Sequence, residues 1–307
     1  IDNGTGNIVE NNVINGGPHG IMVDLSDQTV IRNNAVNLNH YFGKELFPAS
    51  KNSISNRLLS DLRHWNFYHK SMTINVINSA NTRISQNHLF GSLGGIGGTD
   101  NTGTVEIDYN TLHHFNDYAV NYYVGGETMM FHDNLIYEGG LDGWRGGSER
   151  SSAVLYIYRN RFYMLTYVCE PGGYGRCDAS SDLLRESGRG EKMYWYHNSF
   201  AGKTALQMIS GSNPNTWVIN NILSTQFPFT IYEWPTSWHF DYNWLGSDPA
   251  AESWSEFASL WQNGTHNKLH EHTLMWNKTN PDWVPTGDAR SSGIDLSKSW
   301  TLDGVTH

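Results

Sequence analysis

The sequence has no long apolar run, few charged side chains and only two cysteines among its 307 residues. A membrane-spanning helix needs about 18 consecutive apolar residues, so we expect no membrane span. Charged residues make up 16% of the chain and the net charge is −10, which argues against nucleic-acid binding because that requires a basic surface. No cofactor is predicted, since zinc, phosphate-loop and Ser-His-Asp motifs are absent; calcium binding is left open, without a motif.

The two cysteines, Cys169 and Cys177, flank a loop rich in glycine and turn residues at 170–176. We predict a disulfide between them, with two unpaired thiols as the alternative. Three N-glycosylation sequons begin at Asn3, Asn263 and Asn277. The chain opens without Met, as a processed or excised segment would. Together these features predict an extracellular protein, secreted or at the cell surface.

One short repeat is abundant: an asparagine, any residue, and then an apolar residue. Successive repeats lie 22 to 26 residues apart in six of the eight intervals, and we interpret the two longer intervals as insertions. Matches in this register predict a stack of similar coils. The repeat asparagines are Asn12, Asn34, Asn87, Asn110, Asn134, Asn160, Asn198, Asn221 and Asn243.

Apolar residues recur five and three positions before these asparagines and two positions after them. In the coil of Asn110 they are Val105, Ile107 and Leu112. Alternation with period two predicts a strand on either side of a sharp bend. Asparagine suits the bend because it tolerates left-handed backbone angles, and its amide can bond to the equivalent amide of the next coil. We therefore expect a structural ladder of asparagines.

These residues resemble the pectate-lyase-like superfamily of right-handed parallel β-helices, whose PbH1-type repeats carry such a ladder at one bend. The resemblance covers residues 7 to about 245. It implies an all-β solenoid with three short strands per coil and coils about 4.8 Å apart. We expect the β-helix over residues 1–246, with insertions at 38–72 and 164–182. Residues 287–296 are also similar to a degenerate form of the closing segment of many bacterial β-helix proteins.

The two ends carry different signals. The ladder begins 12 residues into the chain without a capping element. An uncovered coil exposes a sheet edge, so we expect upstream coils or a partner chain there. Residues 247–307 are expected to hold a short amphipathic helix, which packs across the end of the solenoid or, alternatively, binds a partner, and then an irregular tail. Asp248 and Pro249 start this helix, and its apolar positions are Trp254, Phe257, Ala258 and Trp261.

The resemblance implies that substrate lies along the outside of one sheet, in a groove bordered by long loops. We place the strands of that sheet about 12 to 15 residues before each ladder asparagine, with both insertions beside it as walls. Such a groove suits a linear polymer, so the expected partner is a polysaccharide or glycan. The residues expected to face outward are Asp24, Asn75, Asn121, Tyr123, Arg145, Arg185, Gln207 and Tyr232.

Uronate-lyase chemistry needs a group that neutralises the sugar carboxylate, a base that removes the C5 proton and an acid that assists the leaving oxygen. We assign the neutralisation of the sugar carboxylate to Arg145 and Arg185. Tyr123 or Lys70 is a candidate base, as are His69 and His113, and Tyr123 or a histidine is a candidate acid. The expected substrate-binding residues are Asn75, Asn121, Gln207 and Tyr232.

Each of these side chains also has a simpler interpretation. The arginines can be surface residues paired with Glu149 or Glu186, and His113, just after a ladder position, can be a hydrogen-bonded structural residue. A hydrolase would need two or three carboxylates at suitable spacing, and no tight Asp–Asp cluster falls on one predicted strand. The carboxylates available to it are Asp117, Asp142, Asp182, Glu186 and Glu233.

We therefore expect an extracellular carbohydrate-interacting β-helix that acts on a polysaccharide, with uronate-type lyase chemistry favoured over hydrolysis. The alternative is a non-catalytic surface, adhesive or structural module of a larger glycoprotein, because a stacked rod is stable without an active site. Fold resemblance alone does not transfer an activity.

Overall fold

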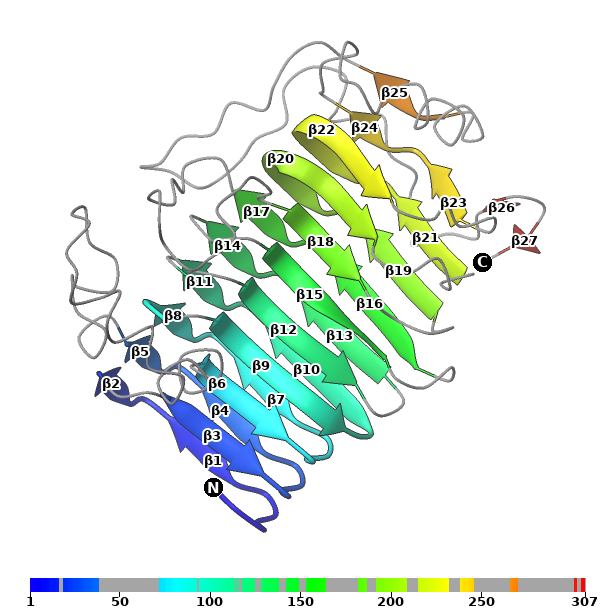
Figure 1. The fold of residues 1–307 in the computed structure, drawn as a ribbon. Helices are drawn as coiled ribbons and strands as arrows, with labels where there is room; N and C mark the ends of the chain where they lie inside the picture. The colour runs from blue at the N-terminus through cyan, green and yellow to red at the C-terminus, as the bar shows by residue number, and fades with distance from the viewer. Residues whose placement is uncertain are drawn as a thin grey trace, which may run out of the picture.

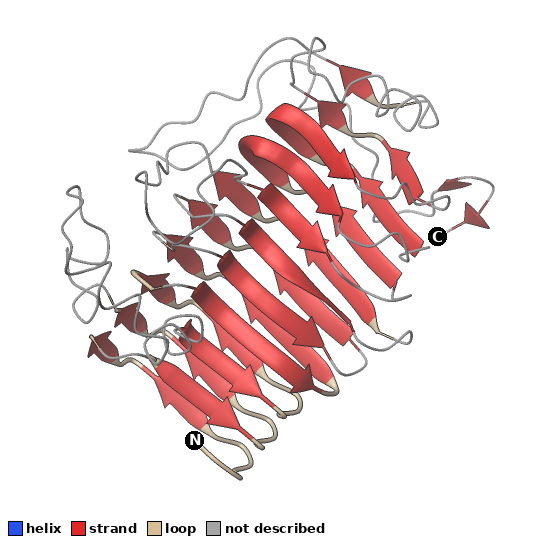
Figure 2. Cartoon of the chain, in the orientation of Figure 1, coloured by secondary structure: helices blue, strands red, loops and turns tan. Residues whose placement is uncertain are grey.

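The computed structural model describes residues 1–16, 19–38, 72–92, 94–113, 115, 118–124, 128–137, 142–148, 153–163, 182–186, 192–208, 215–231, 238–245, 266–269, 301–302 and 305–306. Every regular element in these ranges is a strand, and the strands stack along one axis into a solenoid (Figures 1 and 2). The helix expected after Asp248 lies outside the described residues. Within them, no helix is long and apolar enough to cross a membrane.

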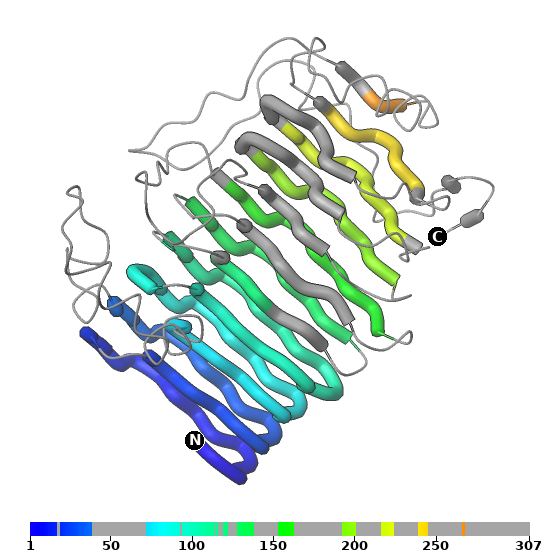
Figure 3. Tube along the Cα trace, in the orientation of Figure 1, coloured from blue at the N-terminus to red at the C-terminus, as the bar shows by residue number. Residues whose placement is uncertain are grey.

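The chain winds as successive coils (Figure 3), and strand pairing makes each face of the solenoid a parallel sheet. We name the first face the ladder sheet, because a ladder asparagine follows each of its strands. Its strands are, in order, β1 (Ile8–Glu10), β4 (Val30–Arg32), β7 (Arg83–Ser85), β10 (Thr104–Asp108), β13 (Thr128–His132), β16 (Val154–Tyr158), β19 (Lys192–Tyr196), β21 (Asn215–Ile219) and β23 (Trp238–Asp241).

The other two faces are named the second and third sheets, in the order in which the chain reaches them after the asparagine. The second sheet contains β2 (Val13–Asn15), β5 (Ala35–Asn37), β8 (His88–Phe90), β11 (Thr111–His113), β14 (Leu135–Tyr137), β17 (Arg161–Tyr163), the starts of β20 (Ser199–Met208) and β22 (Ile222–Ile231), β24 (Trp244–Leu245) and β25 (Lys268–Leu269). The third contains β3 (Ile21–Asp24), β6 (Met72–Ile77), β9 (Gly94–Asn101), β12 (Tyr118–Val124), β15 (Asp142–Ser148), β18 (Asp182–Glu186) and the ends of β20 and β22.

The second and third sheets are joined where strands run through the corner between them. The start of β20 pairs with β17, and its end pairs with β18. A small antiparallel pair, β26 (Thr301–Leu302) and β27 (Val305–Thr306), is separate from the solenoid sheets.

The core is built from the apolar positions that the repeat predicts. Val105 and Ile107 on β10 are fully buried, and the parallel register places Met129 and Phe131 of β13 directly beside them. Leu112, two positions after the ladder asparagine, is also fully buried. Burying one such side chain contributes about 1.5–3 kcal/mol, and the same positions repeat from coil to coil, so one continuous apolar core runs through the solenoid.

The asparagine ladder is confirmed at all nine predicted positions. In each rung the Nδ2 amide donates to Oδ1 of the next asparagine at 2.9–3.2 Å. The backbone amide of each asparagine donates to the same Oδ1 at 2.9–3.1 Å. The ladder continues to a tenth member, Asn267, which accepts from Asn243.

The left-handed residue of the bend is the one before each ladder asparagine, and not the asparagine itself as the sequence suggested. These preceding residues all have φ between 53° and 58°. They include Tyr109, Asp133 and Arg159, which are not glycine or asparagine. The ladder asparagine instead uses its side chain to bond across coils, so the bend is stabilised by two neighbouring residues with separate roles.

The first coil forms one end of each sheet. β1 and β2 have a paired strand on one side only within the described residues, whereas residues 1–3 bond to the outer edge of β3 through a parallel bridge between Asp2 and Asp24. The side chains of Ile8 and Val13 are 59% and 75% exposed there. This is the open edge that the sequence led us to expect; upstream coils or a partner chain covering it stay a prediction.

Candidate functional site

The predicted site residues of the third sheet fall into one row of paired positions. Asn121 on β12 pairs with Arg145 on β15, Arg145 pairs with Arg185 on β18, and Arg185 pairs with Gln207 on β20. In the other direction Asn121 pairs with Gly97 on β9, and Gly97 pairs with Asn75 on β6. We name this row, with Met22 and Thr230 at its ends, the polar row.

The polar row lies on the outer face of the sheet. Ile74 and Val76, on either side of Asn75, are fully buried in the core, whereas Asn75 is partly exposed. Val120 is likewise fully buried beside the partly exposed Asn121. Because side chains alternate along a strand, the positions in register with Asn75 and Asn121 belong to the outer row.

Two features of the described side chains suit the polar row to a ligand. A Cβ at Gly97 would lie 3.0 Å from Asn75 Oδ1 and close to the Met72 side chain, so a residue without a side chain fits best at this point. Asn121 Oδ1 is buried without a hydrogen-bond partner. An unsatisfied buried acceptor costs about 1–3 kcal/mol, and a ligand hydroxyl would reach this oxygen only after the groups that cover it moved.

Other predicted residues fall elsewhere. Tyr123 lies two positions after Asn121 on β12, in register with Gly147. Asp24 pairs with Ile77, two residues further along the strands than the pair of Met22 and Asn75 in the polar row. His113 lies on β11 of the second sheet and therefore not in the polar row, which separates this candidate base from Arg145 and Arg185. The residues outside the described ranges are Lys70, His69, Tyr232, Cys169, Cys177, Asn263 and Asn277.

Both long insertions connect the second sheet to the third. The first follows β5 and leads into β6, and the second follows β17 and leads into β18. The chain therefore enters the third sheet directly after each insertion, on the strands that carry Asn75 and Arg185. That the long loops border the third sheet stays a prediction, because residues 39–71 and 164–181 lie outside the described residues.

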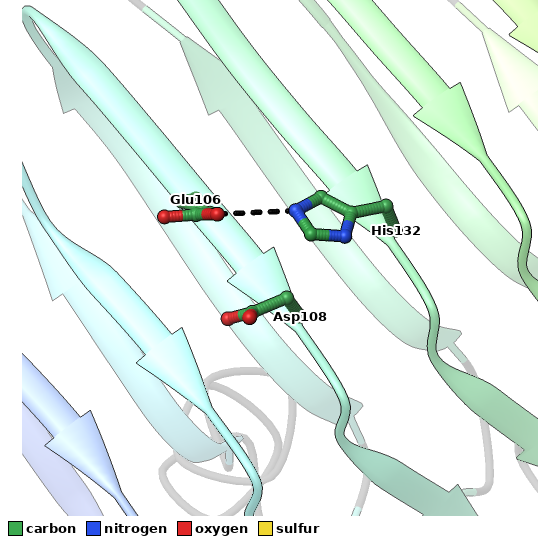
Figure 4. Close-up of side chains that lie close together, drawn as sticks. All are labelled: Glu106, Asp108 and His132. Atoms are coloured by element: carbon green, nitrogen blue, oxygen red, sulfur yellow. Dashed lines mark hydrogen bonds and ion pairs between the residues drawn. The ribbon is translucent and has the colours of Figure 1, made fainter.

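A second cluster of ionisable groups, which sequence reasoning missed, lies on the outer face of the ladder sheet. Glu106 and Asp108 alternate with core residues along β10, and His132 follows on the neighbouring β13 (Figure 4). His132 Nε2 lies 3.1 Å from Glu106 Oε1, and its Nδ1 lies 2.8 Å from Asp133 Oδ2. One potential ligand atom from each of Glu106, Asp108 and His132 lies within 4.8 Å of the others.

Arginines compensate the carboxylates of this cluster. Arg83 donates to both oxygens of Asp108, at 2.7 and 3.2 Å, and Arg159 donates to both oxygens of Asp133, at 2.5 and 2.9 Å. Burial opposes ionisation of Asp133, but the bonds from Arg159 and His132 outweigh it and lower the pKa of this carboxyl group. Both ring nitrogens of His132 face carboxylates, Nε2 that of Glu106 and Nδ1 that of Asp133.

The ladder-sheet cluster is therefore a hydrogen-bonded network of three acids, two arginines and one histidine. Asp108 is fully buried beneath Arg83, so a metal ion would have to displace a bidentate guanidinium to reach it. Asp108 is therefore neither a free acid nor a carboxylate that is open to a metal ion. The arrangement is suited to stabilising the face of the solenoid, and it does not supply the pair of carboxylates that a hydrolase needs.

Aromatic rings continue from this network along the ladder sheet. His132 stacks on Tyr158 at 4.6 Å between ring centroids, and Tyr158 stacks on Tyr196 at 4.9 Å. A parallel row joins Tyr156, Tyr194, Trp217 and His239, with centroids 4.6–5.2 Å apart and planes within 13°. Because each inner ring is covered on both faces by its neighbours, these rings present edges outward. They do not form the flat platform that stacks against a sugar.

A model of the right-handed β-helix region matches residues 1–162 of the 307-residue chain. No curated protein and no solved structure matches the chain. The matched segment contains the first six ladder asparagines, together with Asn75 and Asn121 of the polar row and the Arg145 position.

Proposed function

Because this chain belongs to the right-handed β-helix family, whose fold is consistent with carbohydrate-related proteins, we propose that it binds an extended acidic polysaccharide along the polar row. The observation that carries the proposal is the register of the third sheet, which puts two arginines and three amide residues in a single line along the solenoid axis.

The charge in the row supports an anionic ligand. Arg145 and Arg185 are directly paired on neighbouring parallel strands, which lie about 4.8 Å apart. Like charges in directly opposed positions destabilise a sheet, and a ligand carboxylate at this point would offset the repulsion. Guanidinium groups bind carboxylates through two parallel hydrogen bonds, and the amides of Asn75, Asn121 and Gln207 can bond to sugar hydroxyls.

The chemistry that fits such a ligand is β-elimination. The arginines neutralise the uronate carboxylate, and this makes the C5 proton more acidic. Tyr123 or Lys70 removes that proton, the bond between C4 and the glycosidic oxygen breaks as a C4–C5 double bond forms, and Tyr123 or a histidine donates a proton to the leaving oxygen. The products are an unsaturated uronate and a new chain end. Beyond Gln207 the position in register on β22 is Thr230, and the candidate Tyr232 lies outside the described residues.

The elimination step is tested by following the ultraviolet absorbance of unsaturated uronates with a series of acidic polysaccharides. We expect the signal to grow with wild type and to be lost in Arg185→Ala and Arg145→Ala. Arg32→Ala is the matched control, because Arg32 lies on the ladder sheet in an exposed ion pair with Glu10. Equal product formation in all three variants would remove the polar row from the mechanism.

A non-catalytic rod is the second candidate, and the unbroken asparagine ladder favours it, since the ladder stabilises the solenoid independently of any active site. Binding without an increase in ultraviolet absorbance or release of reducing ends would select this candidate. Either function includes an extracellular location, with a Cys169–Cys177 disulfide and glycans on Asn3, Asn263 or Asn277. Peptide mass spectrometry of the protein from its native source, with and without reduction, tests these modifications; unmodified sequons and alkylatable cysteines would contradict the extracellular location.

A further inference from the structure

Two imidazole rings from neighbouring coils converge on the outer face of the second sheet. His88 is the first residue of β8 and His113 is the last residue of β11. Their Nε2 atoms lie 2.7 Å apart, and their ring centroids lie 4.9 Å apart with 37° between the planes. The two Nε2 atoms are therefore within hydrogen-bond distance of each other, with donor and acceptor set by the tautomers.

The neighbouring rings hold this pair in place. His113 is stacked between Phe90 and Tyr137, at centroid distances of 4.9 and 4.7 Å and with planes within 9°. His88 contacts Phe90 at 5.2 Å. His113 is 9% exposed, whereas His88 is exposed, so one ring is fixed by packing while the other gives access from solvent.

We propose that His88 and His113 form a binding site for a divalent transition-metal ion of the kind that prefers imidazole, such as Cu²⁺ or Zn²⁺. Two nitrogens bound to one metal at about 2.0–2.1 Å lie about 2.9 Å apart at the right angle of a tetragonal Cu²⁺ site and about 3.3 Å apart at the tetrahedral angle of Zn²⁺. The observed separation of 2.7 Å therefore needs to open less for Cu²⁺ than for Zn²⁺. Neutral imidazole is a preferred ligand for both ions.

The protonation state also suits a ligand. Partial burial lowers the pKa of His88, which favours the neutral ring at physiological pH. In the metal-free pair one Nε2 donates its hydrogen to the other; when a metal binds both Nε2 atoms, that proton moves to Nδ1 of the same ring, so both rings bind as neutral imidazoles. Water completes the coordination on the exposed side of His88. The site is independent of the polar row and of the ladder-sheet network, and it does not rest on the proposed function.

The test is titration of the purified protein with Cu²⁺ and, separately, Zn²⁺, monitored by calorimetry and, for Cu²⁺, by electron paramagnetic resonance. We expect saturable binding of one ion, with hyperfine coupling from two nitrogens. His88→Gln should weaken binding by at least roughly tenfold, the loss that even an outer-shell partner of a metal ligand causes. Since His88 is exposed, this variant should fold, and a thermal melt without metal checks that it does.

The chain has 14 histidines, so a matched control is needed. His197→Gln replaces an exposed histidine at a left-handed bend position, where Gln86 occupies the equivalent place in another coil. This variant should bind metal as wild type does. Unchanged affinity in His88→Gln, or the absence of saturable binding in wild type, would overturn the proposal and leave the pair as a proton-sharing contact alone.

Discussion

Asn110 donates its side-chain amide to Oδ1 of Asn134 at 3.0 Å, and it donates the same amide to the backbone oxygens of Ile84 and Asp108 at 2.9 and 3.0 Å. One side chain thus joins three consecutive coils. Asn110→Ala should lower the free energy of unfolding by about 1–3 kcal/mol, because buried partners lose their bonds. Urea unfolding measures this effect, with the exposed Asn15→Ala on edge strand β2 as control. Equal urea midpoints for the two variants would contradict the structural role of the ladder.

Asp133 makes the stability of the ladder sheet sensitive to acid. Its folded-state pKa is lowered by Arg159 and His132, so its contribution is present above the unfolded pKa of about 3.9 and is lost as pH falls through the folded value. Asp133→Asn should therefore be less stable than wild type at neutral pH, with the difference shrinking below about pH 4. Asparagine tolerates the left-handed φ of 56° at this position, so the backbone is unperturbed. A difference that stays constant down to acid pH would contradict the account.

Tyr196 makes the same sheet sensitive to alkali. Burial, with smaller electrostatic effects that include Tyr158, raises the pKa of its phenol to about 12. The unfolded chain ionises near pH 10, so the folded state loses stability between about pH 10 and 12. Tyr196→Phe, which keeps the stacked ring and lacks the ionising hydroxyl, should lose less stability over that interval. Thermal melts at pH 9 and pH 11 compare the two proteins; parallel losses would show that Tyr196 ionises normally.

The outer aromatic rows should stabilise the solenoid by stacking. Tyr194 contacts Tyr156 on one face and Trp217 on the other, at 5.2 and 4.6 Å. Tyr194→Ala should lower stability by about 1–3 kcal/mol, since each aromatic pair contributes about 0.5–1.5 kcal/mol beyond its buried area. Tyr194→Phe keeps both stacks and should remain near wild type in the same denaturant titration. A loss in the phenylalanine variant as large as that in the alanine variant would assign the effect to the hydroxyl group instead.

The fold was predictable because its determinants are local. The sequence of one coil is enough to predict the core positions five and three residues before Asn110. The spacing between successive asparagines is enough to predict the ladder. Counting back from the asparagines also placed Asn75, Asn121, Arg145, Arg185 and Gln207 on one sheet, and the register confirms that they share a row.

The ladder-sheet network was missed because it depends on positions four and two before the asparagine, which alternate with the core and face outward. Reading Glu106 and Asp108 beside His132 and Tyr158 in these positions would have revealed it. The tenth ladder member carries the same signal, Asn267-Lys268-Leu269, 24 residues after Asn243. The contact between His88 and His113 is diagonal across coils, so no spacing within one coil predicts it.

Binding of an acidic oligosaccharide tests the central claim most directly, because binding depends on the polar row and does not require turnover. Calorimetric titration with uronate oligomers should give saturable binding that is weakened in Arg145→Gln and Arg185→Gln and unchanged in Arg32→Gln. The same oligomers with carboxylates reduced to alcohols should bind poorly. Equal affinity in the two polar-row variants and in wild type, or no binding of any acidic oligomer, would contradict the assignment of the polar row as a polysaccharide site.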